Sequence, residues 1–319
     1  MAGPLSRAAL EDFLPCSIEY FLSHSTLVDS KAQSKNITHP TLYRLPQAPK
    51  DGSRYYLTIE DVVKGGDFST AKSYVNDFWK AGMTYTDIQF WFFNAYNGPG
   101  TAKFDNFVFN KVKNTGNVDL APLGEHVGDW ESCAIRIDNA SKDMIGIMLS
   151  AHGKNVFYSK DDIAKRFKMI NETHPFVYAS LNGHANFPTP GPNYSEHRKA
   201  LGISVGLEFS LLNSTVDGGA QLDCSKKYQV MKVSWLEGTP DAYASPAWVE
   251  YPYRWRPEGT ATTMSSKNLG DFIKAALGDK EVDASCVVLA ASELLHVFVT
   301  ANINGSMAPE QQGPWSGAY

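Results

Sequence analysis

Short runs of apolar and β-branched residues, separated by turn-forming residues, recur along most of the chain. The alternation predicts β-strands at residues 88–93, 131–137, 144–151, 155–158, 176–180 and 228–235. Asp138-Asn139-Ala140-Ser141 separates two of these runs and predicts an antiparallel hairpin. Strands are not regularly followed by helical patterns, which disfavours a doubly wound parallel sheet.

A helical period appears in fewer places. It predicts helices at residues 69–81, 159–170, 269–278 and 283–302. In the first, Tyr74 and Phe78 lie one turn apart, and in the second Ser159 and Asp162 match a capping box. We therefore expect a mainly β protein with flanking helices, α+β overall, built on an antiparallel β-sandwich core. It would form one domain over residues 1–319, with an N-terminal extension to about residue 50 and C-terminal helices at about 267–303.

Composition narrows the class of protein. Hydrophobic residues make up 43% and charged residues 20% of the 319 positions, which is typical of a globular chain. The net charge is -5 and no long Lys/Arg run occurs, so we expect no nucleic-acid partner. Glu11 and Asp12 stand where a signal peptide needs apolar residues, and Glu293 and His296 interrupt the most apolar stretch. We expect no transmembrane span and a cytoplasmic location.

The densest cluster of polar residues is Gly-Glu-His-Val-Gly-Asp-Trp-Glu at positions 124–131. Because side chains alternate along a strand, Asp129 and Glu131 share one face and repel each other unless something positive lies between them. His126 precedes them in a glycine-flanked turn. The spacing predicts a divalent-metal site with His126, Asp129 and Glu131 as ligands.

Other residues are candidates for catalysis or substrate binding beside this site. The predicted hairpin brings His152 near Asp129, and His184 follows the strand at 176–180, so both are candidate acid–base residues. The alternative is that each histidine only ties down a loop by hydrogen bonds. The candidate substrate contacts are Trp91, Asn94, Tyr96, Asn186, Tyr253 and Trp255. Core packing is the competing interpretation for Trp91.

Two weaker motif matches fail in their context. Residues 202–206 read Gly-Ile-Ser-Val-Gly, but the nucleophile elbow that this pattern describes requires a following helix, and none is predicted. The Glu-x-x-His spacing at residues 293–296 has no second copy, which a di-iron bundle needs. No nucleotide-binding fingerprint occurs.

Several motifs together resemble the vacuolar protein sorting-associated family of the "sixty-two" type, found in fungi and plants. They are Trp-Phe-Phe-Asn at 91–94, His-Val-Gly-Asp-Trp-Glu at 126–131, Ser-Ala-His-Gly at 150–153, Gly-His-Ala-Asn at 183–186 and Gly-Pro-Trp at 313–315. The shorter pattern His-x-x-Asp-Trp-Glu also resembles the necrosis- and ethylene-inducing-like cytolysins. In that family, residues matching His126, Asp129 and Glu131 hold a divalent cation at one end of a β-sandwich, and a later histidine similar to His152 belongs to the same end. That resemblance implies Mg²⁺ or Ca²⁺ rather than zinc.

These features leave more than one function open. The first is a metal-dependent enzyme of the lyase, hydrolase or cyclase type that acts on a small, partly apolar molecule. The cation would be a Lewis acid, and His152 or His184 would move a proton. The second is a metal-dependent membrane or glycolipid binder similar to the cytolysins, with membrane lipid as its partner. The third is a trafficking-related protein with a structural ion.

Overall fold

The computed structural model describes the chain from its N-terminal strand to the region of Trp255. The described residues are 5–6, 11–31, 36–41, 45, 55–79, 83–109, 112–121, 124–151, 154–201, 205–234, 246, 248–249, 251 and 255. The expected helices at 269–278 and 283–302 lie outside them. None of the helices in the described part is long and apolar enough to cross a membrane.

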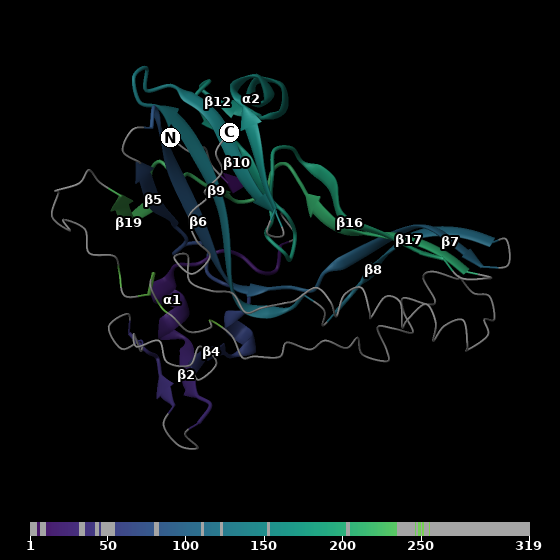
Figure 1. Ribbon diagram of the computed structural model, residues 1–319. Coiled ribbons are helices and arrows are strands. Elements are labelled where there is room, and N and C mark those ends of the chain that lie inside the picture. The colour runs from purple at the N-terminus through teal and green to yellow at the C-terminus, as the bar shows by residue number, and fades with distance from the viewer. Residues whose placement is uncertain are drawn as a thin grey trace.

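A six-stranded sheet forms the centre of the molecule (Figure 1). In spatial order its strands are β11 (Lys154–Ser159), β10 (Met144–Ala151), β9 (His126–Asp138), β6 (Tyr85–Asn97), β5 (Ser73–Trp79) and β19 (Tyr228–Ser234). Neighbouring strands are antiparallel except β19 and β5, which run parallel. The hairpin expected around residues 138–141 is confirmed, since β9 pairs with β10. Asp138 Oδ1 accepts hydrogen bonds from the backbone N–H groups of Ala140 and Ser141, which stabilises the turn.

A smaller sheet packs on one face of the central sheet. It is formed by β15 (Asn186–Phe187), β14 (Val177–Ala179), β1 (Leu5–Ser6) and β18 (Gln221–Leu222). The core between the layers includes Phe90, Ile135 and Leu149 from the central sheet and Val177 and Leu222 from the smaller one. The expected mainly β, antiparallel architecture is thereby confirmed.

The opposite face of the central sheet carries a second core. Over it lie helix α1 (Ile18–Ser23), a sheet of β3 (Ile37–Thr38), β2 (Ser25–Asp29) and β4 (Tyr55–Ile59), and the 3₁₀ helix η2 (Asp61–Val63). Phe90 and Phe92 of β6 belong to the first core, and Trp91 and Phe93 to the second. Because β6 is buried on both faces in its middle, residues 90–93 form a continuous apolar run.

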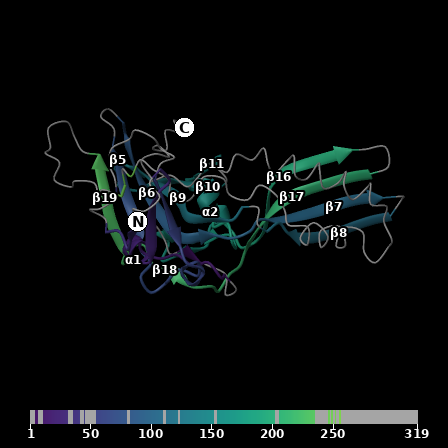
Figure 2. The same ribbon diagram turned by 90° about the horizontal axis from the view of Figure 1, so that it is seen from below.

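A long four-stranded antiparallel sheet extends away from the sandwich, as both views show (Figures 1 and 2). We call it the arm. It consists of β16 (Gly191–Leu201), β17 (Val205–Thr215), β7 (Thr101–Phe109) and β8 (Val112–Asp119). A two-stranded sheet of β12 (Met169–Ile170) and β13 (His174–Pro175) lies near helix α2 (Lys160–Arg166), which packs against β10 and β11 at the edge of the central sheet.

One helix prediction is wrong and another is confirmed. The helix expected at residues 69–81 is wrong, because residues 73–79 are strand β5 and Tyr74–Trp79 pair with β6. The separation of four between Tyr74 and Phe78 is a multiple of two, so it fits one face of a strand as well as one face of a helix. The helix beginning at Ser159 is α2, with both hydrogen bonds of the capping box between Ser159 and Asp162. It ends earlier than expected, because Phe167 adopts an extended conformation.

Candidate site at the pole of the sandwich

The predicted polar cluster lies where β6 ends and β9 begins, and we call this end of the sandwich the pole. The register pairs Asn94 with Asp129 and Asn97 with His126. Gly128 between them has φ +65°, and a Cβ atom there would lie 2.9 Å from the Cβ of Trp255. A glycine therefore suits this position both by conformation and by the close approach of the Trp255 side chain.

The central interaction of the pole joins a carboxylate to an imidazole. Asp129 Oδ2 lies 2.8 Å from His184 Nδ1, and the two residues are 7% and 1% exposed. A carboxylate can only accept, so the proton of the neutral His184 ring resides on Nδ1. His184 Nε2 is buried, has no hydrogen-bond partner among the residues that the structure describes, and lies 3.9 Å from Oε1 of Glu11. The backbone of His184 has φ +55°, in a turn that aims the ring into the pole.

Glu11 is a member of the pole that sequence reasoning missed. Its side chain is 2% exposed, and its two oxygens accept hydrogen bonds from the backbone N–H groups of Phe13 at 2.9 Å and Asn182 at 3.0 Å. The second bond joins residues 171 positions apart and holds the N-terminal segment against the loop that carries His184. No motif or spacing marks Glu11 in the sequence.

Glu131 lies two residues beyond Asp129 on β9. Burial raises the pKa of Glu131 well above its usual range, and the neighbouring charge of Asp129 raises it further. His126 Nε2 lies 3.9 Å from Asp129 Oδ1, and the His126 side chain is 14% exposed. The pole thus concentrates negative charge in a nearly dry environment, which a bound cation would relieve.

The donor atoms at the pole suit a divalent cation, although they do not form a finished site. Among the residues that the structure describes, no group of three His, Cys, Asp or Glu side chains is arranged to hold a metal ion. The distances of 3.9 Å from His126 to Asp129 and from His184 to Glu11 exceed a hydrogen bond. Oxygen and imidazole ligands bind such ions at about 2.0–2.6 Å, so each gap is wide enough for an ion to bridge. The donor chemistry therefore fits the cation, and the side chains would have to close around it.

Three of the expected substrate contacts lie near this cluster. Asn94 is buried directly opposite Asp129 in the sheet. The Tyr96 hydroxyl donates to Glu125 Oε2 at 2.7 Å, and burial together with that carboxylate raises the pKa of Tyr96. Asn186 Nδ2 donates to the carbonyl oxygen of Ser132 at 3.0 Å, so this side chain joins β15 to β9.

Two tryptophans that were expected to contact substrate are buried in the hydrophobic core. Trp91 and Trp255 are 3% and 0% exposed and belong to the second core, where both pack against Trp130 with ring centroids 6.3 and 5.8 Å apart. Their positions account for them as packing residues. The remaining expected site residues, His152 and Tyr253, lie outside the described residues.

The comparison with family models agrees with the first resemblance noted in the sequence. A family model described as vacuolar protein sorting-associated protein 62 matches residues 8–283. Comparison with curated proteins finds no match. Matching solved structures include NLPPya in complex with glucosamine, with 15% identity and a TM-score of 0.25 over 52% of this chain and 53% of that one. Another is necrosis and ethylene inducing protein 2 from the causal agent of cocoa's witches' broom disease, with 14% identity and a TM-score of 0.28. This match covers 86% of this chain and 98% of that protein's chain. The chain spans about half the length of the first of these structures.

Proposed function

The chain belongs to the family of vacuolar protein sorting-associated protein 62, and from the geometry of its pole we propose that it binds a divalent cation there and uses it in chemistry on a small molecule. The observation that carries the proposal is the buried Asp129–His184 hydrogen bond, together with His184 Nε2, which has no hydrogen-bond partner in the described part of the chain and lies 3.9 Å from the Glu11 carboxylate. This pairing is typical of histidines that move protons and of histidines that ligate metals.

The roles follow from the donor atoms. His126, Asp129 and Glu131 would hold Mg²⁺ or Ca²⁺, with Glu11 on the far side of His184. When bound, such an ion supplies a Lewis acid that polarises a carbonyl or phosphoryl oxygen. Asp129 keeps the proton of His184 on Nδ1, so that Nε2 is ready to accept a proton from a substrate. His126 is partly exposed and marks the side from which a ligand would enter.

The test is the metal content of protein purified without chelators and then dialysed against Mg²⁺ or Ca²⁺. We expect about one equivalent in the natural protein and a loss in Asp129→Asn, since this substitution removes the charge that the ion neutralises. Asp77→Asn is the matched control, because Asp77 is another carboxyl of the central sheet whose pKa burial raises. Equal metal content in all of these proteins, or none in any, would contradict the proposal.

Metal-dependent membrane binding is a second candidate, favoured by the surface of the arm. Tyr194 of β16 is 49% exposed, and the Nζ of Lys103 on β7 lies 4.6 Å from the centre of its ring. Exposed tyrosine next to lysine is typical of side chains at a membrane–water interface. Leakage of dye from glycolipid-containing vesicles, requiring Mg²⁺ or Ca²⁺ and weakened in Tyr194→Ser, would support this candidate over a reaction on a small molecule.

A further inference from the structure

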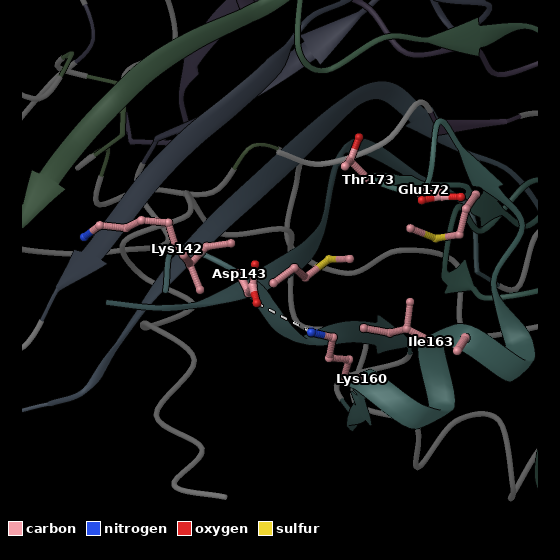
Figure 3. A pocket seen from close by; sticks show the side chains of 10 residues that line it. Lys142, Asp143, Lys160, Ile163, Glu172 and Thr173 are labelled. Atoms are coloured by element: carbon pink, nitrogen blue, oxygen red, sulfur yellow. Dashed lines mark ion pairs between the residues drawn. The ribbon is translucent and has the colours of Figure 1, made fainter. Parts of the chain in front are cut away.

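A cavity of about 500 Å³ lies at the opposite end of β9 from the pole. It is open to solvent on one side and is lined by the tip of the β9–β10 hairpin, helix α2 and the turn between β12 and β13 (Figure 3). Its nearest residue on β9, Ile137, is eight positions from Asp129, which corresponds to roughly 26 Å along a strand. The volume is within the range of small-molecule sites, and the distance separates this cavity from the chemistry of the pole.

The walls of the cavity are largely apolar. Ile137 and Met144 come from the hairpin, Ile163 from α2, and Met169 from β12. Methionine side chains are flexible and have polarizable thioethers, so they adapt to ligands of varied shape. These walls would accommodate an alkyl chain or a ring rather than a highly polar molecule.

The charged side chains at the opening of the cavity indicate the sign of the charge that a bound ligand would carry. Lys160 Nζ lies 3.6 Å from Asp143 Oδ2, so this cation already has a carboxylate partner. Figure 3 shows the amine of Lys142 directed away from the cavity, whereas Glu172 lies at its edge. Glu172 is exposed in a turn in which its own φ is +61°. Glu172 is therefore the carboxylate of the lining that has no lysine partner among the described residues.

We propose that this cavity binds a small amphipathic amine. The apolar body of the ligand lies between the methionines, and its ammonium group pairs with the carboxylate of Glu172. A carboxylate ligand with the same apolar body meets like charge at this edge and binds more weakly.

The experiment titrates ¹⁵N-labelled full-length protein with octylammonium, and separately with octanoate and octanol, and follows the amide resonances of Ile163 and Met169. We expect octylammonium to shift these resonances with the lowest Kd of the three. In Glu172→Gln its binding should weaken about two- to fivefold, the effect of losing one exposed ion pair. Glu60→Gln is the matched control, because Glu60 is exposed outside the cavity and its side chain makes no capping hydrogen bond.

The titration distinguishes results that support the proposal from results that overturn it. The proposal stands if Glu172→Gln alone removes the preference for the amine and a chelator leaves that preference unchanged. It is overturned if octanoate binds as tightly as octylammonium, if Glu60→Gln has the same effect as Glu172→Gln, or if no ligand shifts the resonances around the cavity. Ala164 of α2 is exposed and lines the cavity, so Ala164→Phe should place a ring in the space that the ligand would fill. This variant should weaken the binding of all three ligands.

Discussion

The central sheet contains a buried ion pair between Arg136 and Asp87, and removing either partner should destabilise the protein strongly. These residues are directly paired across β6 and β9, with Arg136 Nε 2.8 Å from Asp87 Oδ1 and its second nitrogen 2.9 Å from Oδ2. The side chains are 3% and 10% exposed, and the guanidinium lies 3.7 Å from the ring centre of Tyr85. If one side chain of the pair is removed, little water can reach the remaining charged side chain to solvate it.

The expected cost follows from that burial. Removing one partner of a buried pair leaves an uncompensated charge and typically costs about 3–5 kcal/mol. We therefore expect Asp87→Asn to lower the free energy of unfolding by about 3 kcal/mol. Arg136→Met should cost slightly more, because it also loses about 0.5–1 kcal/mol of cation–π interaction with Tyr85. The double variant should cost about 2 kcal/mol less than the sum of the single variants, since no charge is left stranded.

Urea unfolding followed by tryptophan fluorescence measures these changes, because Trp91 and Trp130 are buried in the core. Asp143→Asn is the control. It removes the exposed partner of Lys160, where the side chains are 62% and 69% exposed, and it should cost less than about 0.5 kcal/mol. A cost for Asp87→Asn as small as that of the control, or strict additivity in the double variant, would refute the reasoning.

Three further perturbations test other parts of the fold. Without divalent cations, the raised pKa of Glu131 makes its contribution to stability fully present below its unfolded pKa of about 4.3, and that contribution is lost as the pH rises through the folded pKa. Glu131→Gln should therefore flatten the dependence of Tm on pH. An unchanged slope would contradict this expectation. Ser159→Ala removes the cap of α2 and should lower the free energy of unfolding by about 1 kcal/mol, whereas Ser141→Ala, in an exposed turn, should change it less. Gly128→Ala combines φ +65° with a contact of 2.9 Å to Trp255 and should cost at least about 1–2 kcal/mol in urea unfolding, a prediction that a neutral result would overturn.

Local patterns predicted the parts of the fold whose determinants are close together in the chain. Residues 144–151 were expected as a strand and form β10 over the same residues. The Ser159–Asp162 capping box predicted the start of α2, because the interaction involves residues only three positions apart. The turn at residues 138–141 likewise depends on one aspartate and the N–H groups that follow it.

Patterns with two valid periods could not be resolved in this way. Tyr74 and Phe78 satisfy the spacing of a helix face and of a strand face, and the choice was made by pairing with β6 and by burial of Tyr74. The Tyr74 hydroxyl accepts a hydrogen bond from the backbone N–H of Ile18 at 2.7 Å, a partner 56 positions away. Such contacts override local propensity, because they exist only after the chain has folded.

Some residues of the candidate site were predictable from local patterns, and others were placed only by tertiary contacts. By itself the sequence determined that His126, Asp129 and Glu131 lie at one strand end, because strand alternation and spacing are properties of neighbouring residues. Only the tertiary structure decided that His184 pairs with Asp129 and that Glu11 lies on the other side of its ring. It also placed Trp255 in the core. These contacts join segments separated by 55 to 173 positions, and packing of the whole sandwich brings them together rather than any local pattern.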